Sequence, residues 1–376
     1  MFISLSSVMN TTIWMSLLIL LLLLLTSRPV SLLKLSLPVI VATGILILLR
    51  LLLPLEFFFT HTIGVKKILP VLYSILRSPL IIHDTKTLRL YHVLGCIWFI
   101  GSTILFIRMA LSYRRLHNIL ARMNPVTDPD ILTILKEVNS QFKHPRNFSL
   151  LTSPNVVSPF ITGLYKSAIV IPDTDWKTET IQHILNHELH HFYRGHLQIT
   201  FFCECVRNIY FWNPLIHMLV NRLDLILELD VDKSVTDTYN KQDKLSYMDC
   251  LLYISKRQYK SRKNTLPGIA FTTSQTSGLK QRINYLLNPP KSKWTQFHSI
   301  LFYGMLCTLI TLSLLCICEP TSPPKEVNNG IFTVDEENSY FIQRQDGLYD
   351  FYFNNTYTST VKEIFDTTIP VKETLP

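Results

Sequence analysis

Four long apolar stretches constrain the fold of this chain more than any other feature. They cover residues 1–27, 35–55, 92–107 and 294–318, and hydrophobic residues make up 48% of the sequence. A helix needs roughly 20 apolar residues to cross the hydrocarbon core of a bilayer. Three of the stretches reach that length directly, and residues 92–107 reach it if Arg108 extends its charged end to the interface. The sequence therefore predicts four transmembrane helices and a lipid bilayer as a partner.

The distribution of charge predicts how these helices are oriented. Arg28 and Lys34 follow the first stretch, basic residues follow the third and precede the fourth, and the segment after the fourth is acidic. Because cytoplasmic loops carry an excess of lysine and arginine, we expect both termini outside the plasma membrane and residues 108–293 in the cytoplasm. The loop between the second and third stretches is assigned to the outside by alternation, although it carries Lys66, Lys67, Arg77, Lys86 and Arg89.

The same pattern divides the chain into four expected parts. Residues 1–107 hold three spans, residues 108–293 form a cytoplasmic domain, residues 294–318 form the fourth span, and residues 319–376 form a short extracytoplasmic tail. The net charge of +9 indicates contact with anionic lipid, since no basic run is interleaved with aromatic residues on one predicted face. Direct binding to nucleic acid is therefore not expected. Arg50 lies near a span end, and its side chain is expected to extend to the interface.

Apolar residues at helical spacing predict a mostly helical cytoplasmic domain with one pair of strands. The predicted helices cover residues 108–124, 128–143, 178–195, 200–220 and 222–233. Residues 155–172 are rich in valine, isoleucine and phenylalanine and predict the two strands, of which residues 168–171 are the firmest. Residues 259–278 are polar and predict an exposed loop. In the tail, Asp346-Gly347 lies between two alternating runs and favours a type I′ hairpin turn within a small β-meander.

The most informative motif is His187-Glu188-Leu189-His190-His191, an HExxH sequence on a predicted helix. The spacing of four residues puts His187 and His191 on one face of the helix, where both imidazoles can reach one Zn²⁺ ion. Zinc lowers the pKa of a water molecule that it binds. Glu188, adjacent to the first histidine, is placed to take a proton from that water. The motif therefore predicts a hydrolase that cleaves peptide bonds.

A catalytic zinc ion takes a third protein ligand and leaves a position open for water. The longer motif HExxHxxGxxH does not apply, because Arg194 and Leu197 occupy its last two fixed positions. Downstream, Glu228 and Asp232 lie one helical turn apart. Glu228 could complete the ligand set, and Asp232 could hydrogen-bond a zinc-bound histidine and fix its tautomer. Glu204 is the rival third ligand.

With these residues the chain resembles the BlaR/MecR-type membrane metallopeptidases, a gluzincin-like family of antirepressor and signal-transducing peptidases. The resemblance rests on residues 50–54, 159–172, 187–196, 211–215 and 228–232. It implies that His187, His191 and Glu228 are zinc ligands. It also implies that Glu188 is the general base and that Asp232 supports a ligand from behind.

Two features depart from the family pattern. This chain has His196 and Val231 where the family often has aspartate and cysteine, and neither position is implied to bind zinc. The best-known members carry an outer penicillin-binding sensor domain, for which residues 319–376 are expected to be too short, so β-lactam sensing is not carried over. The expected fold class is a mainly α membrane protein with four transmembrane helices, an α+β gluzincin-like zinc peptidase domain and a small C-terminal β-meander.

The motif and the resemblance predict an integral membrane zinc metalloendopeptidase. It would transduce an extracytoplasmic signal by site-specific proteolysis of a cytoplasmic regulator, such as a transcriptional repressor. Two alternatives stay open: a peptidase that degrades misfolded membrane proteins, and a non-catalytic membrane receptor that keeps a zinc-stabilised fold. The sequence carries no signal for an oligomeric state. The resemblance also implies self-cleavage within the inner domain, for which residues 259–278, with the apolar pair Ala270-Phe271, are the best candidate. A passive linker is the alternative interpretation of the same residues.

One strand of the cytoplasmic domain is predicted to bind substrate. We expect it to lie at the edge of the active-site sheet and to pair with an extended peptide, because edge pairing supplies main-chain hydrogen bonds. Its residues are Ala168, Ile169, Val170 and Ile171. Tyr165, His183 and His196 are weaker candidates for stabilising an oxyanion.

Overall fold

The structure is a computed structural model of the 376-residue chain. It describes residues 5–26, 37–54, 60–65, 68–83, 86–163, 167–261, 278–288, 292–320, 339–344, 347–353, 356–361 and 369–372. The chain divides into two compact units. The larger unit comprises residues 1–64 and 79–319, and the smaller comprises residues 65–78 and 320–376.

Helices occupy all four of the apolar stretches. α1 (Leu5–Thr26) and α5 (Leu90–Leu120) are long and apolar enough to cross a membrane. α3 (Leu37–Leu52) and the apolar half of α12 (Ser292–Leu315) are shorter apolar helices. The third stretch and the predicted helix that follows it are one continuous helix, α5. Since only 6% of the apolar segment of α5 is buried, this helix exposes a long apolar surface.

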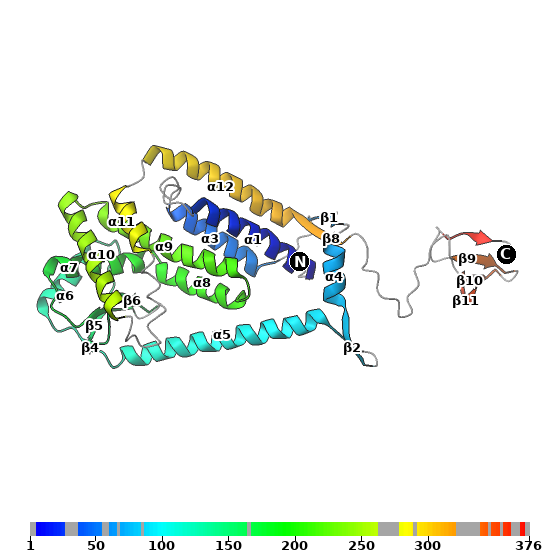
Figure 1. The fold of residues 1–376 in the computed structure, drawn as a ribbon, viewed down its shortest axis with the longest axis horizontal. Coiled ribbons are helices and arrows are strands. Elements are labelled where there is room, and N and C mark those ends of the chain that lie inside the picture. The colour runs from blue at the N-terminus through cyan, green and yellow to red at the C-terminus, as the bar shows by residue number, and fades with distance from the viewer. Residues whose placement is uncertain are drawn as a thin grey trace. The chain divides into compact units, whose positions relative to one another are not determined.

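A single apolar core joins three of these helices to other helices of the larger unit. α1, α3 and α12 share a hydrophobic cluster with α8 (His196–Ile209) and α9 (Pro214–Thr236), and Figure 1 shows α1 and α3 beside α8 and α9. Gly44 allows the close approach of α3 to α9, because a Cβ atom there would lie 2.7 Å from Leu223. Helix α9, which carries Glu228 and Asp232, therefore packs directly on the apolar helices.

Polar side chains add specific links within this apolar core. Arg50 on α3 is 9% exposed, and its guanidinium donates to the carbonyl oxygens of Leu53 and of Ser313 on α12. The Tyr210 hydroxyl, after α8, donates to the carbonyl oxygen of Leu51 at 2.7 Å. The expectation that Arg50 extends outward is wrong: its charge is satisfied by backbone oxygens inside the protein, which ties α3 to α12.

The expected helix over residues 200–220 is wrong, because the chain breaks there between two helices. α8 ends at Ile209, and Asn213 caps α9 by accepting a hydrogen bond from the Leu215 amide at 3.0 Å. Pro214 occupies the first position of α9, where its missing amide hydrogen costs nothing. α9 then continues through the next predicted helix to Thr236.

A four-stranded sheet packs beside the helix that carries the HExxH motif. Its strands are β4 (Asn124–Pro125), β5 (Ser149–Ser153), β7 (Ala168–Pro172) and β6 (Phe160–Thr162), in that order across the sheet. β7 runs parallel to β5 and antiparallel to β6. α6 (Pro129–Ser140) and α7 (Thr178–Tyr193) share a core with the sheet. The predicted strand pair within residues 155–172 is confirmed.

The predicted edge position of Ala168 to Ile171 is wrong. β7 lies inside the sheet with β5 on one side and β6 on the other, and its five residues are buried. The edge strand on that side is β6. The error arises from β5, because its sequence Ser-Leu-Leu-Thr-Ser lacks a strong strand pattern. The sequence therefore does not predict that β7 has a second neighbouring strand.

Two further helices pack against α9. α10 (Lys241–Ser261) and α11 (Leu279–Leu287) pack on each other and on α9. Of the predicted polar loop, residues 259–261 end α10, and the segment with Ala270-Phe271 lies outside the described residues. Short pairs of strands, β1 (His61–Val65) with β8 (Cys316–Pro320) and β2 (Pro79–His83) with β3 (Lys86–Arg89), complete the larger unit.

The smaller unit contains α4 (Ile68–Arg77) and a four-stranded sheet. The strands β9 (Ser339–Gln343), β10 (Tyr349–Phe353), β11 (Thr356–Val361) and β12 (Val371–Lys372) are ordered β11-β10-β9-β12. The antiparallel run β9-β10-β11 is the expected meander. The prediction of a type I′ turn with Asp346-Gly347 at its centre is wrong. The Gly347 amide donates to the carbonyl oxygen of Arg344 at 3.1 Å, so Gly347 is the last residue of the turn. The φ of +82° at this position favours glycine.

Candidate metal centre

Two helices bring the three predicted metal ligands together. His187 and His191 lie one turn apart on α7, and Glu228 on α9 contacts both of them. The Nε2 atoms of the two histidines lie 3.2 Å apart. Each lies 3.4 Å from a carboxylate oxygen of Glu228. Among the described residues, these three side chains form a group that could hold a metal ion.

The spacing of these atoms fits zinc. Donors about 2.0–2.1 Å from a tetrahedral zinc ion lie roughly 3.3 Å from one another, which matches separations of 3.2 to 3.4 Å. Two imidazoles and one carboxylate are a ligand set that zinc takes in catalytic sites, with a fourth position left for water. Burial lowers the pKa of His191 to about 3 despite the nearby Glu228 carboxylate. His191 is therefore neutral at physiological pH, as a metal ligand must be.

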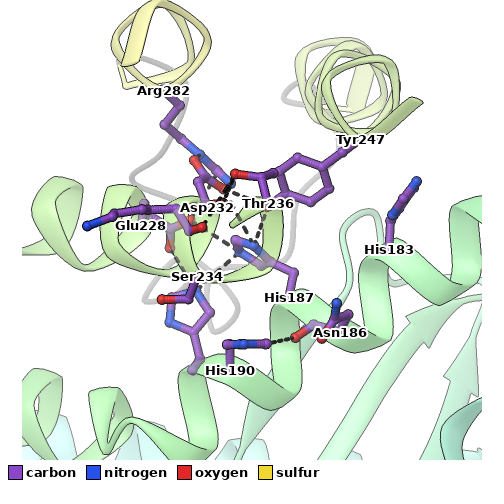
Figure 2. A network of polar contacts seen from close by, with 12 residues as sticks. His183, Asn186, His187, His190, Glu228, Asp232, Ser234, Thr236, Tyr247 and Arg282 are labelled. Carbon is purple, nitrogen blue, oxygen red and sulfur yellow. Dashed lines mark hydrogen bonds and ion pairs between the residues drawn. The ribbon is translucent and has the colours of Figure 1, made fainter. Parts of the chain in front are cut away.

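The Tyr247 hydroxyl contacts His187 at Nδ1, the ring nitrogen that does not face Glu228 (Figure 2). It lies 2.8 Å from Nδ1 of His187 and donates to Oδ1 of Asp232 at 2.6 Å. Nδ1 of His187 itself lies 3.6 Å from Asp232. The direct hydrogen bond expected between Asp232 and the histidine is not formed, and the Tyr247 hydroxyl lies between the two side chains. This arrangement directs Nε2 of His187 toward Glu228.

A second set of side chains supports His191. Its Nδ1 lies 3.2 Å from Nδ1 of His196, whose Nε2 lies 3.6 Å from Oδ2 of Asp230. Arg194 donates to the same Asp230 oxygen at 2.6 Å. His191 can thus donate to His196 while its Nε2 faces the other ligands. His196 contacts the predicted ligand His191. Its predicted role in stabilising an oxyanion stays a prediction.

Arg282 on α11 contacts two of the acidic residues of α9, Asp232 and Glu228. Its guanidinium makes two hydrogen bonds of 2.6 Å to Asp232 and a contact of 3.0 Å to Glu228. Burial opposes the charged form of Glu228, but Arg282 and the two histidines hold its pKa well below its usual range. The carboxylate is therefore ionised and ready to bind a cation.

Glu188 lies next to the ligands, as the motif requires. Burial raises the pKa of Glu188 to about 7, and the Glu228 carboxylate adds to the rise. His187 and a backbone hydrogen bond from Ile161 on the edge strand β6 act in the opposite direction. A carboxylate whose pKa lies near neutrality suits a general base. The contact with Ile161 places that base beside the edge of the sheet.

A cavity of about 920 Å³ opens over these residues. Its walls come from α5, α8, α10 and β6 as well as from α7 and α9. Glu204 lines this cavity, but its carboxylate accepts a hydrogen bond from Arg207 at 2.7 Å and does not belong to the ligand group. A cavity of this size accommodates several residues of a peptide.

The remaining predicted residues have other surroundings. His183 lines the cavity, and both of its ring nitrogens lie near hydroxyl groups, at 3.0 Å from Tyr239 and 3.2 Å from Ser246. Tyr165 lies outside the described residues. Ile169 and Val170 are fully buried within the sheet.

Sequence reasoning missed Tyr247, Arg282 and Asp230. Asp230 lies inside the Glu228–Asp232 segment and could have been proposed from its acidic character alone. Tyr247 and Arg282 stand outside any short motif, and their roles depend on how α10 and α11 pack on α9.

A helix with the HExxH motif, joined by a glutamate from a second helix, has the arrangement of a metallopeptidase centre. The comparison with known families agrees: the family described as BlaR1 peptidase M56 matches residues 6–286. The chain belongs to this family, and the resemblance stated from the sequence is confirmed.

Relatives of known name cover a smaller region. The chain is 22% identical over 194 residues to the regulatory protein BlaR1 of Bacillus licheniformis, which is 51% of this chain and 32% of that protein. It is 22% identical over 209 residues to the methicillin resistance mecR1 proteins of Staphylococcus aureus and Staphylococcus epidermidis, which is 54% of this chain and 35% of those proteins. The matched region spans about a third of the length of these relatives.

Proposed function

We propose that this protein is an integral membrane zinc metalloendopeptidase. The observation that carries the proposal is the convergence of His187, His191 and Glu228, whose donor atoms are separated by 3.2 to 3.4 Å. Membership of a peptidase family supports the same conclusion. Bound Zn²⁺ would polarise the substrate carbonyl and acidify a water molecule.

The side chains around the centre divide the remaining work. His187, His191 and Glu228 hold the ion, while Tyr247 and His196 fix the two imidazole rings. Glu188 takes a proton from the attacking water and returns it to the leaving amide nitrogen as the peptide bond breaks. Burial of Glu188 favours this exchange, because its pKa lies at about 7.

The edge strand β6 is the better candidate for pairing with substrate. Phe160, Ile161 and Thr162 line the cavity, and the Ile161 backbone reaches the carboxylate of Glu188. An extended peptide added at this edge would pass beside the general base. Sheet-edge pairing draws its affinity from the main chain, so we expect modest sequence preference from this contact.

The membrane arrangement that we propose has four spans. They correspond to α1, α3, the apolar part of α5 and α12, with residues 108–293 in the cytoplasm and both termini outside. The long exposed apolar surface of α5 supports contact with lipid. The expected division into residues 1–107, 108–293, 294–318 and 319–376 forms part of this proposal.

The proposed substrate is a cytoplasmic regulator, such as a transcriptional repressor. The names of the relatives, a regulatory protein and a methicillin resistance protein, support a role in signalling. Cleavage of one regulator would convert an extracytoplasmic event into a change inside the cell. The inducing signal would act through the spans and the outer tail.

A pair of variants on α7 tests the catalytic assignment. Glu188→Gln is expected to keep about one zinc per chain and to lower kcat about a hundredfold or more. Glu179→Gln, in the exposed first turn of the same helix, should keep both zinc and activity. The measurements are zinc content and hydrolysis of an unfolded protein such as casein by the purified chain in detergent. Full activity of Glu188→Gln would show that another group is the base.

The proposed function and its two alternatives predict different protein levels in cells that express Glu188→Gln. A signalling peptidase predicts that one or two proteins accumulate relative to wild type. A quality-control peptidase predicts that many membrane proteins accumulate. An unchanged proteome with an unchanged phenotype would favour a non-catalytic receptor.

Orientation can be measured with single cysteines in a variant whose seven native cysteines are replaced. Lys143→Cys lies in the proposed cytoplasmic part and Tyr357→Cys in the outer tail. An impermeant maleimide added to intact cells should label only Tyr357→Cys, and lysis should expose Lys143→Cys. Labelling of Lys143→Cys before lysis would reverse the topology.

A further inference from the structure

Arg282 makes three contacts with the acidic residues of the metal centre. Its Nε and Nη2 atoms donate to the two oxygens of Asp232 at 2.6 Å, and Nη1 lies 3.0 Å from Oε2 of Glu228. Figure 2 shows the side chain reaching from α11 to both carboxylates on α9. With 6% exposure, Arg282 is as buried as the groups that it contacts.

The surroundings explain why a cation is required there. Glu228 and Asp232 are 7% and 0% exposed and lie one turn apart on α9. Two ionised carboxylates in such a poorly solvated place repel each other unless a positive charge lies between them. An arginine guanidinium keeps its positive charge in proteins, so Arg282 supplies that charge between the two carboxylates.

Arg282 reaches the ligand set by two routes. One route is direct, through Glu228. The other passes through Asp232 to the Tyr247 hydroxyl, and from there to Nδ1 of His187 at 2.8 Å. A displacement of Arg282 would disturb two of the three ligands at once.

We propose that Arg282 is a positioning residue, which sets the orientation of Glu228 and, through Asp232 and Tyr247, of His187. The role rests on the proposed zinc peptidase function and extends it to α11. A guanidinium suits the task because its planar fork bonds one carboxylate with two parallel bonds and leaves a third donor for the other. A lysine ammonium carries the same charge without that geometry.

The matched control is Arg222, a partly buried arginine that links the same two helices. It lies on α9 and donates to Oε1 of Gln281 on α11 at 3.1 Å. Replacing Arg222 with lysine therefore perturbs the contact between α9 and α11 without touching Glu228 or Asp232. A general weakening of that contact would affect both variants alike.

The experiment compares Arg282→Lys and Arg222→Lys with the full-length wild-type chain in detergent. The measurements are the Kd for Zn²⁺ by competition with a chelator, and the visible spectrum of the Co²⁺-loaded protein. Arg282→Lys should weaken zinc binding about 10- to 100-fold, the usual effect of losing a group that orients ligands, and should change the cobalt spectrum. Its kcat should fall more than its KM rises. Arg222→Lys should retain the wild-type Kd and spectrum.

A double variant distinguishes the loss of the Arg282 contacts from a folding defect. Asp232→Asn with Arg282→Gln removes both charges, and neutral replacement of a buried ion pair is often tolerated. The double variant should melt close to the wild-type temperature and still bind zinc about tenfold or more weakly, because Glu228 has lost its guanidinium contact.

Two outcomes would overturn the role of Arg282. One is a wild-type zinc Kd and cobalt spectrum in Arg282→Lys or in the folded double variant. The other is an equal loss in Arg222→Lys, which would reduce Arg282 to a general packing residue. Failure of the proposed function has a different signature, since a wild-type chain that binds zinc yet hydrolyses no protein leaves the metal measurements intact.

Discussion

The Tyr247 hydroxyl lies 2.8 Å from Nδ1 of His187, within the interior of the protein. The same hydroxyl donates a hydrogen bond to Oδ1 of Asp232 at 2.6 Å. The tyrosine therefore determines which nitrogen of His187 faces the metal site, although Tyr247 belongs to a helix 60 residues further along the chain.

Replacing Tyr247 with phenylalanine tests this relationship. The variant leaves Nδ1 of His187 and the Asp232 carboxylate without the hydroxyl, and an unsatisfied buried polar group costs about 1–3 kcal/mol. We expect zinc affinity to fall about tenfold or more and the melting temperature to decrease. Tyr253→Phe removes an exposed hydroxyl from the same helix and should change neither. An unaltered zinc Kd in Tyr247→Phe would mean that the ring orientation of His187 is fixed by other contacts.

The identity of the third ligand can be tested with two glutamates that line the same cavity. Glu228→Gln should lose most bound zinc, because the amide is a much poorer ligand than the carboxylate and two histidines remain. Glu204→Gln should retain about one zinc per chain, since Glu204 pairs with Arg207. Zinc content after dialysis distinguishes them. The reverse result would make Glu204 the ligand.

His196 offers a test of the support behind His191. His196→Leu removes the group that lies 3.2 Å from Nδ1 of His191, and we expect a zinc Kd about tenfold higher. The asparagine side chain in His196→Asn has the same number and branching of heavy atoms as leucine, and its amide oxygen can accept the hydrogen bond. Its Kd should lie between those of wild type and His196→Leu. Equal values for the two variants would exclude the hydrogen bond as the cause.

The position of β6 at the sheet edge predicts how substrates respond to backbone methylation. Main-chain groups of a strand point alternately toward and away from a neighbouring strand. Methylating the amide nitrogens of a cleavable peptide one at a time should therefore raise KM at alternate positions and leave intervening positions unaffected. A uniform response along the peptide would argue against pairing at β6.

The sequence predicted the centre where local spacing determines geometry. His187 and His191 share a helix face because they are four residues apart, and the same spacing brings Glu228 and Asp232 to one side of α9. Pairing those two helices required only that both motifs serve one metal ion. Tyr247 and Arg282 could not be predicted in this way, because each is a single residue whose role arises from the packing of α10 and α11 against α9.

The fold errors have equally specific causes. Residues 168–171 were recognised as a strand from their β-branched content, but that content does not distinguish an edge strand from an interior one. The answer depended on β5, whose serine and threonine residues give it no clear strand pattern in the sequence. The predicted helix over residues 200–220 runs through Pro214, whereas in the structure Pro214 begins a new helix after the Asn213 cap.

The most direct test of the metal centre is the zinc X-ray absorption spectrum of the purified chain. A site formed by His187, His191 and Glu228 predicts only nitrogen and oxygen neighbours at about 2.0–2.2 Å, with the outer scattering of imidazole rings. The same spectrum of Glu228→Gln should lose intensity as the metal is lost. Sulfur neighbours at about 2.3 Å would place zinc on cysteines instead and would contradict the proposed peptidase centre.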